Sequence, residues 1–88
     1  MKIVNTIETA KGKLLYTVFS ETAGDTEHFG IAVSSKIFGD EETAAVAQIT
    51  TNPAFVEKIA FMLADNFVLP STLSEVIEEC VASEFTVN

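Results

Sequence analysis

Residues 51–81 read TNPAFVEKIAFMLADNFVLPSTLSEVIEECV and predict two amphipathic helices joined by a short connection. Asn52 is a good N-cap because its side-chain oxygen can accept from an unpaired amide of the first turn. Pro53 suits the first helical position, where a missing N–H costs nothing. Asn66 tolerates a left-handed backbone and predicts the end of this helix, which spans about residues 53–65. Apolar residues recur on one side of it at helical spacing: Phe55, Val56, Ile59, Ala60 and Leu63.

The second predicted helix spans about residues 72–82. Thr72 and Glu75 stand in the capping-box relation, and Pro70 either fixes the preceding turn or is itself the first helical residue. Its apolar stripe consists of Leu73, Val76, Ile77, Cys80 and Val81. Burial of such a stripe gains about 1.5–3 kcal/mol per large side chain, whereas local propensity supplies only tenths. We therefore expect both helices to form against an apolar surface that residues 67–69 also enter.

The first 50 residues predict the strands of that surface. Residues 2–9 alternate loosely, with Ile3 and Ile7 on one side, and residues 13–20 and 28–34 alternate more clearly. Residues 10–13 predict a tight turn, and residues 21–26 a polar loop. Residues 43–50 are rich in alanine and are compatible with either helix or strand; their short length favours a strand. Phe85 and Val87, in the short tail 83–88, either add an edge strand or fold back.

This order of elements predicts one α+β domain over residues 1–88. Its sheet is a three- to four-stranded antiparallel meander within residues 2–50, followed by two C-terminal helices packed on one face. The predicted core contains residues from both layers: Phe29, Ile31, Val33, Ile59, Leu63, Val76, Ile77 and Cys80.

The charge of the chain excludes several classes of partner. Its formal net charge is −8, and its five basic residues are all lysines, so conventional binding of nucleic acid, which needs clustered Lys and Arg, is excluded. The longest apolar run, residues 59–64, is far shorter than the roughly 20 residues of a membrane span. With no apolar run at its start that resembles a signal peptide, the chain is expected to be cytoplasmic. Its single cysteine, Cys80, permits no intramolecular disulfide and is expected to be a buried structural thiol.

Several short sequence features carry a resemblance to a known family. They are Phe29-Gly30-Ile31, Ile49-Thr50-Thr51-Asn52, Phe55-Val56-Glu57, and Asn66 followed by Val68, Pro70, Leu73 and Val76-Ile77-Glu78. On these features the segment 28–81 resembles a family of short, uncharacterised proteins from Firmicute-type bacteria, a domain of unknown function. The resemblance implies the α+β architecture and passes on no catalytic residues.

No motif for catalysis, a metal or a cofactor emerges from the residues themselves. The single histidine, His28, lies on the predicted solvent side of a strand, where no motif orients Asp25 or Glu27 toward it. The carboxylates of residues 39–42 and of the second helix belong to no rigid ligand loop. We therefore expect no enzymatic activity, no cofactor and no metal.

Two surfaces stand out as candidate contact sites for an unknown protein partner. One is Phe61, which falls on the polar side of the first helix among Glu57, Lys58 and Asp65. The other is the outward face of the sheet, where Leu15 and Phe19 point and where a second copy of the chain would give a homodimer. Exposed apolar groups rimmed by charge are typical of contact surfaces. The sequence thus favours a regulatory or accessory domain that acts through protein–protein contacts. The alternatives are an acidic mimic of nucleic acid, which would occupy a basic surface of another protein, and an enzyme that uses carboxylates.

Overall fold

Four antiparallel strands form one sheet in the order in which they occur along the chain, β1-β2-β3-β4. The computed structural model describes residues 2–37 and 39–85. The strands are β1 (Lys2–Thr9), β2 (Leu14–Ala23), β3 (Thr26–Ser35) and β4 (Glu42–Thr50). The α-helix α1 (Pro53–Asp65), the short 3-10 helix η1 (Pro70–Thr72) and the α-helix α2 (Leu73–Phe85) follow. The predicted α+β fold is confirmed, and the alanine-rich residues 43–50 form a strand.

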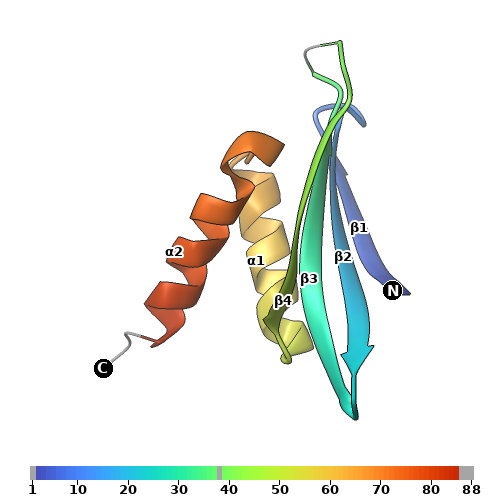
Figure 1. Cartoon of the computed structure of the whole chain (residues 1–88). Coiled ribbons are helices and arrows are strands. Elements are labelled where there is room, and N and C mark those ends of the chain that lie inside the picture. Colours follow the sequence, from blue (N-terminus) through green and yellow to red (C-terminus); the bar gives the residue numbers. More distant parts are fainter. Residues whose placement is uncertain (1, 38, 86–88) are drawn as a thin grey trace.

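Both helices lie on the same side of the sheet, as Figure 1 shows. Helix α1 packs against all four strands, whereas α2 packs against the edge strand β4 and η1. No described element lies on the opposite side of the sheet (Figure 1). The domain is therefore a two-layer structure in which one sheet face is buried and the other is open.

The core lies between the inner sheet face and the two helices. From the strands, it contains Leu14, Tyr16, Val18, Phe29, Ile31 and Val33; from the helices, it contains Val56, Ile59, Ala60, Leu63, Leu73 and Ile77. Six of the eight predicted core residues are buried here. Val76 and Cys80 are only half-buried against this core, because α2 covers the edge strand rather than the centre of the sheet.

The strands β2 and β3 are longer than the sequence predicted. Residues 21–26 form the end of a hairpin and not a loop, since the strand pairing continues to Ala23 and Thr26. Only two residues connect the strands. The first of them, Gly24, has a φ of +64°, which a tight hairpin turn of this length favours and which glycine adopts without strain.

A bulge in β1 puts on opposite faces of the sheet two residues that the sequence predicts on the same face. Ile7 pairs with the core residue Tyr16, but the register shifts between Ile3 and Asn5, and Ile3 pairs with Phe19 instead. Ile3 therefore lies on the outer face and is 63% exposed. The expectation that Ile3 and Ile7 share a side is wrong, because one extra residue in a strand moves everything beyond it to the other face.

A second bulge, in β4, brings that strand so close to Gly30 that no side chain fits there. The pairing of β3 with β4 is irregular between Phe29 and Ile31, and Gln48 has a φ of +53°. A Cβ on Gly30 would lie 2.5 Å from the Val46 carbonyl oxygen, 2.6 Å from the tip of the Phe19 ring and 2.9 Å from a Cα of β4. The Phe19 ring therefore lies over the glycine and is only 4% exposed, although its strand position faces outward.

The ends of the helices agree only in part with the sequence. The Asn52 side chain accepts from the amides of the first turn of α1, at 2.9 and 3.3 Å. Thr72, however, belongs to η1, and its hydroxyl donates to the Leu69 carbonyl oxygen, so it does not cap α2 as predicted. Phe85 is the last residue of α2 and forms no edge strand, while Val87 lies outside the described residues.

One buried hydrogen bond connects the sheet to the connection between the helices. The Tyr16 hydroxyl, in the middle of β2, donates to the Val68 carbonyl oxygen at 2.9 Å. Both residues are buried, and burial raises the pKa of Tyr16 to about 12. A buried carbonyl without this donor would carry the full cost of its lost hydration.

Substitution of Gly30 by alanine should destabilise the fold strongly. The added Cβ collides with backbone atoms of β4 and not only with a side chain, so the strands must separate. We expect the free energy of unfolding to fall by about 2 kcal/mol or more, measured by urea denaturation. Ala32→Ser, two residues along the same face, is the matched control and should change it by less than about 0.5 kcal/mol. Equal stabilities of the two variants would contradict the close approach of β4.

The stability of the domain should depend on Tyr16 at alkaline pH. The phenol of an unfolded tyrosine loses its proton near pH 10, whereas the folded protein holds this proton up to about pH 12. Between these values the unfolded state binds fewer protons, so stability is constant below about pH 10 and falls as the pH rises to about 12.

This dependence is measurable by denaturation across that pH range. Because Tyr16 is the single tyrosine, tyrosinate absorbance follows it alone. Tyr16→Phe should lose this part of the alkaline destabilisation and retain the part that comes from the lysines. An unchanged alkaline profile in Tyr16→Phe would contradict the burial of the phenol.

Candidate functional site

Phe61 is exposed to solvent on α1, where the helical pattern of the sequence places it. Its exposed fraction is 52%. Residues three or four positions away are its neighbours on the helix surface: Lys58 and Asp65 are exposed and Glu57 is half-buried. Charged side chains therefore surround the Phe61 ring, and they shield little of its apolar surface from solvent.

A second exposed phenylalanine, Phe67, follows directly after α1. The helix ends in a Schellman motif, in which the amide of Val68 donates to the Leu63 carbonyl oxygen at 3.1 Å and the amide of Phe67 donates to that of Ala64 at 3.2 Å. Phe67 takes the left-handed position of this motif, with a φ of +50°. Asn66, predicted as the left-handed residue, has a φ of −102°.

The side chain of Phe67 is unfavourable in two respects. Glycine is the usual residue at this position because a Cβ in the left-handed conformation costs about 1–2 kcal/mol. The ring is also 56% exposed, so it lies outside the core, although the sequence predicts that it enters the core. Val68, the next residue, is buried and Leu69 is half-buried.

Phe61 and Phe67 lie near the same end of α1. Phe61 lies five residues before the C-cap of α1, Asn66, and Phe67 directly follows this C-cap. We call Phe61 and Phe67 together the aromatic pair.

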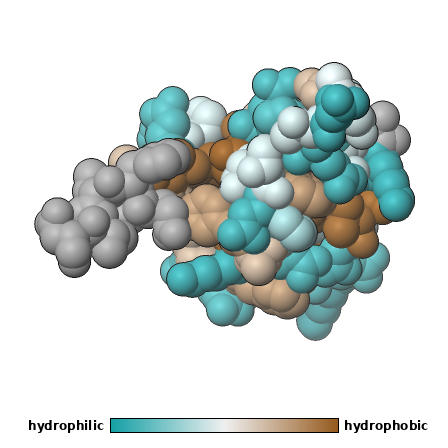
Figure 2. Space-filling model, turned by 90° about the horizontal axis from the view of Figure 1, so that it is seen from below, coloured by the Kyte–Doolittle hydropathy of each residue, from teal (hydrophilic) through white to brown (hydrophobic). Residues whose placement is uncertain are grey.

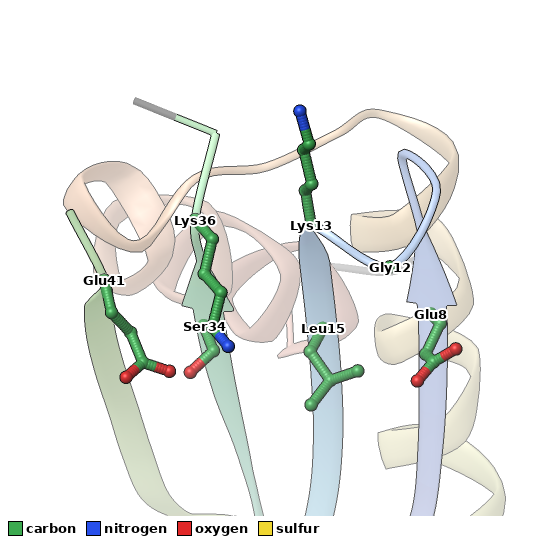
Figure 3. Close-up of a pocket in the computed structure, with 7 residues that line it drawn as sticks. All are labelled: Glu8, Gly12, Lys13, Leu15, Ser34, Lys36 and Glu41. Atoms are coloured by element: carbon green, nitrogen blue, oxygen red, sulfur yellow. The ribbon is translucent and has the colours of Figure 1, made fainter. Parts of the chain in front are cut away.

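The outer sheet face contains a shallow polar hollow of about 230 Å³ near the β1–β2 turn. Figure 3 shows its side chains in front of the strands with the helices behind: Lys36 extends along its strand toward Ser34, whereas Lys13 points away from the other side chains. Seven residues line it: Glu8, Gly12, Lys13, Leu15, Ser34, Lys36 and Glu41. Both charge signs are present, which gives the hollow no clear preference for an anion or a cation.

Small uncharged residues form the middle of the outer sheet face. Thr6, Thr17, Ala32 and Ala45 pair with one another across all four strands. Next to this row, the hydroxyls of Ser34 and Thr43 share a hydrogen bond of 2.8 Å.

The two predicted contact residues of the sheet differ in accessibility. Leu15 is half-buried and offers some surface. Phe19 faces outward by register, but only 4% of it is exposed, because its ring is covered at Gly30 and β4.

The chemically reactive residues do not converge on a site. No group of three or more His, Cys, Asp or Glu able to hold a metal occurs among residues 2–37 and 39–85. His28 is half-buried and pairs across the strands with Glu21. Burial, and secondly the nearby carboxylate of Glu79, raise the pKa of the Cys80 thiol, which keeps it in the less reactive protonated form.

The surface seen from below is a mosaic, with hydrophobic residues in separate places among hydrophilic ones (Figure 2). In the described part of the chain, no helix has the length and apolar character needed to cross a membrane. On the face that Figure 2 shows, the hydrophobic surface is therefore divided into separate areas.

Comparison with known proteins identifies a family and no individual relative. A family model described as "Family of unknown function (DUF6514)" matches residues 1–83. The chain belongs to this family. The match extends through the N-terminal strand, beyond the segment 28–81 on which the resemblance rested. No curated protein and no solved structure matched significantly. The bacterial origin stays a prediction.

Sequence reasoning found Phe61 but missed Phe67. Helical spacing identifies an apolar residue on a polar face, which is why Phe61 was recognisable. Phe67 stands in the apolar run Phe67-Val68-Leu69, which is typical of a buried connection. The available signal was the absence of glycine after Asn66, where a helix of this kind usually ends.

Phe67→Gly should stabilise the domain. Glycine removes the strain of the left-handed backbone, and little buried surface is lost, so we expect the free energy of unfolding to rise by about 0.5–1 kcal/mol. Phe67→Ala is the matched control, since it removes the ring but keeps the strain, and it should show no such gain. Urea denaturation measures both. A loss of stability in Phe67→Gly would mean that the ring supports the core.

Proposed function

We propose that this domain acts by binding another protein and that the aromatic pair supplies the anchors of the contact. The observation that supports this most strongly is Phe67. Its left-handed backbone conformation favours glycine, and its exposure to solvent favours a polar side chain. A bulky aromatic residue there stabilises neither the helix end nor the core. Strained backbone positions of this kind concentrate at functional sites, and aromatic residues, Phe included, are enriched in the cores of protein–protein interfaces.

The chemistry around the aromatic pair indicates the kind of partner. Glu57 and Asp65 flank Phe61 and outnumber the one nearby cation, Lys58. The chain as a whole carries a net charge of −8. A complementary surface therefore has apolar pockets for one or two aromatic rings and basic residues around them. Such charge complementarity contributes to the rate and the specificity of association more than to its strength.

The experiment compares capture of a partner by the domain and by variants of the aromatic pair. Proteins retained by the immobilised wild-type domain from its native cells are identified by mass spectrometry, and the purified partner is titrated by calorimetry. Phe61→Ser and Phe67→Gly should each weaken its affinity about 30-fold or more, because hot-spot residues contribute at least about 2 kcal/mol. The melting temperature should change little in Phe61→Ser and should rise in Phe67→Gly.

Ile37→Ser is the matched control, since Ile37 is also an exposed hydrophobic residue (37%) but lies in the connection between β3 and β4. Its partner affinity should equal that of the wild-type domain. Two results would refute the proposal: undiminished binding by both Phe variants, or a loss of stability of several kcal/mol in Phe61→Ser, as truncation of a core phenylalanine gives.

A further inference from the structure

The side chains that point outward along β2 would complement those of a second copy of the strand that runs in the opposite direction. From one end to the other they are Lys13, which directly precedes β2, and then Leu15, Thr17, Phe19 and Glu21 within the strand. Lys13 and Glu21 lie four residues on either side of Thr17 and carry opposite charges. Leu15 and Phe19 lie two residues on either side of it, and both are apolar. Two copies of β2 placed face to face and running in opposite directions would therefore oppose unlike charges at both ends, with Leu15 and the covered Phe19 ring between them.

The neighbouring strand β3 has its centre at the same level as β2. Ala32 pairs with Thr17 and occupies the corresponding centre of β3. Lys36, four residues to one side, lies opposite Glu41 in β4, one pair beyond the pairing of Ser35 with Glu42. Lys13 lies beside Lys36, because the Lys36 amide donates to its carbonyl oxygen at 2.8 Å. The side chain of Lys13 extends away from that of Lys36 (Figure 3), which leaves its ammonium group open to an external carboxylate.

We propose that the outer sheet face binds a second copy of this chain, with a two-fold axis that crosses the strands at Thr17. A two-fold axis in the plane of the interface brings the same face of both copies together. In this orientation Lys13 of each copy faces Glu21 of the other, and the small residues of the central row meet across the axis. The proposal rests on the sheet alone and is independent of the aromatic pair.

The area of the face is sufficient for a weak specific dimer. Four strands about 4.8 Å apart and about eight residues long at about 3.3 Å per residue cover about 500 Å² per copy. The total of about 1,000 Å² lies at the lower limit of specific interfaces. Small side chains permit close approach of two sheets, and few charged groups lose hydration at the centre. Because Leu15 is half-buried and Phe19 is covered, the face offers few anchoring side chains, and we expect a dissociation constant in the micromolar range.

The edges of the sheet are poor alternatives for self-association. Both edge strands, β1 and β4, contain an irregularity of register, and bulges at edges are one of the features that prevent strand addition. The exposed side of α2 is also unsuitable for a second copy, because it includes Glu75, Glu78 and Glu79, and like charges would face one another. Of the surfaces of the sheet, the outer face is therefore the one suited to a second copy.

Sedimentation across the micromolar range tests the dimer. The wild-type chain should pass from monomer to dimer as its concentration rises, and Thr17→Arg, which places a charge at the axis, should remain a monomer. Ser74→Arg is the matched control on the exposed side of α2 and should dimerise like the wild type, with urea denaturation confirming that both variants fold. A wild-type chain that stays monomeric, or a dimer that Thr17→Arg leaves unchanged, would overturn the proposal.

Charge exchange tests the orientation of the two copies. Lys13→Glu and Glu21→Lys should each raise the dissociation constant of the dimer about tenfold, because like charges then face one another in two symmetric places. Mixing the two variants should restore dimers, since Glu and Lys again oppose each other in both places. If the mixture associates no better than either variant alone, Lys13 does not face Glu21 and the proposed axis is wrong.

Discussion

The hydrogen bond from the Tyr16 hydroxyl to the Val68 carbonyl oxygen joins two residues that are 52 positions apart. It ties the centre of the sheet to the connection from which both helices diverge. With Val68 held in the core, the chain reverses after α1 through the Schellman motif, and the residue before Val68 takes the left-handed conformation. Burial of one side chain thus places its neighbour, Phe67, on the surface. The position of Phe67 is a consequence of how the helices are attached to the sheet.

The two proposed surfaces face in different directions. The aromatic pair belongs to the helical layer, and the outer sheet face belongs to the other layer (Figure 1). A dimer through the sheets would leave both helical layers accessible, so each dimer would present two aromatic pairs. Binding of a partner at two such sites gains effective concentration when the partner is itself repeated or multimeric. A weak dimer and a modest single site then suffice for strong attachment.

The aromatic pair and the outer sheet face differ in the charge of their surroundings. Acidic residues crowd the exposed side of α2 and flank Phe61, while the centre of the outer sheet face is uncharged. A net charge of −8 on a small domain keeps copies apart in most orientations. Self-association is therefore favoured only where the charges are few and alternate in sign, and a different protein bound at the aromatic pair is expected to be basic.

The sequence by itself determined the elements, because the periodicity of apolar residues reports which side of a helix or strand is buried. It predicted α1 over its full length, the inward side of β3, the α+β meander and the exposure of Phe61. Tertiary structure alone decided the rest. The two bulges that move Ile3 outward and bring β4 onto Gly30 arise from pairing between strands, and no single strand encodes them locally. Phe67 is exposed because the following residue is pinned by Tyr16 from a distant strand, a contact that no pattern within the connection reveals.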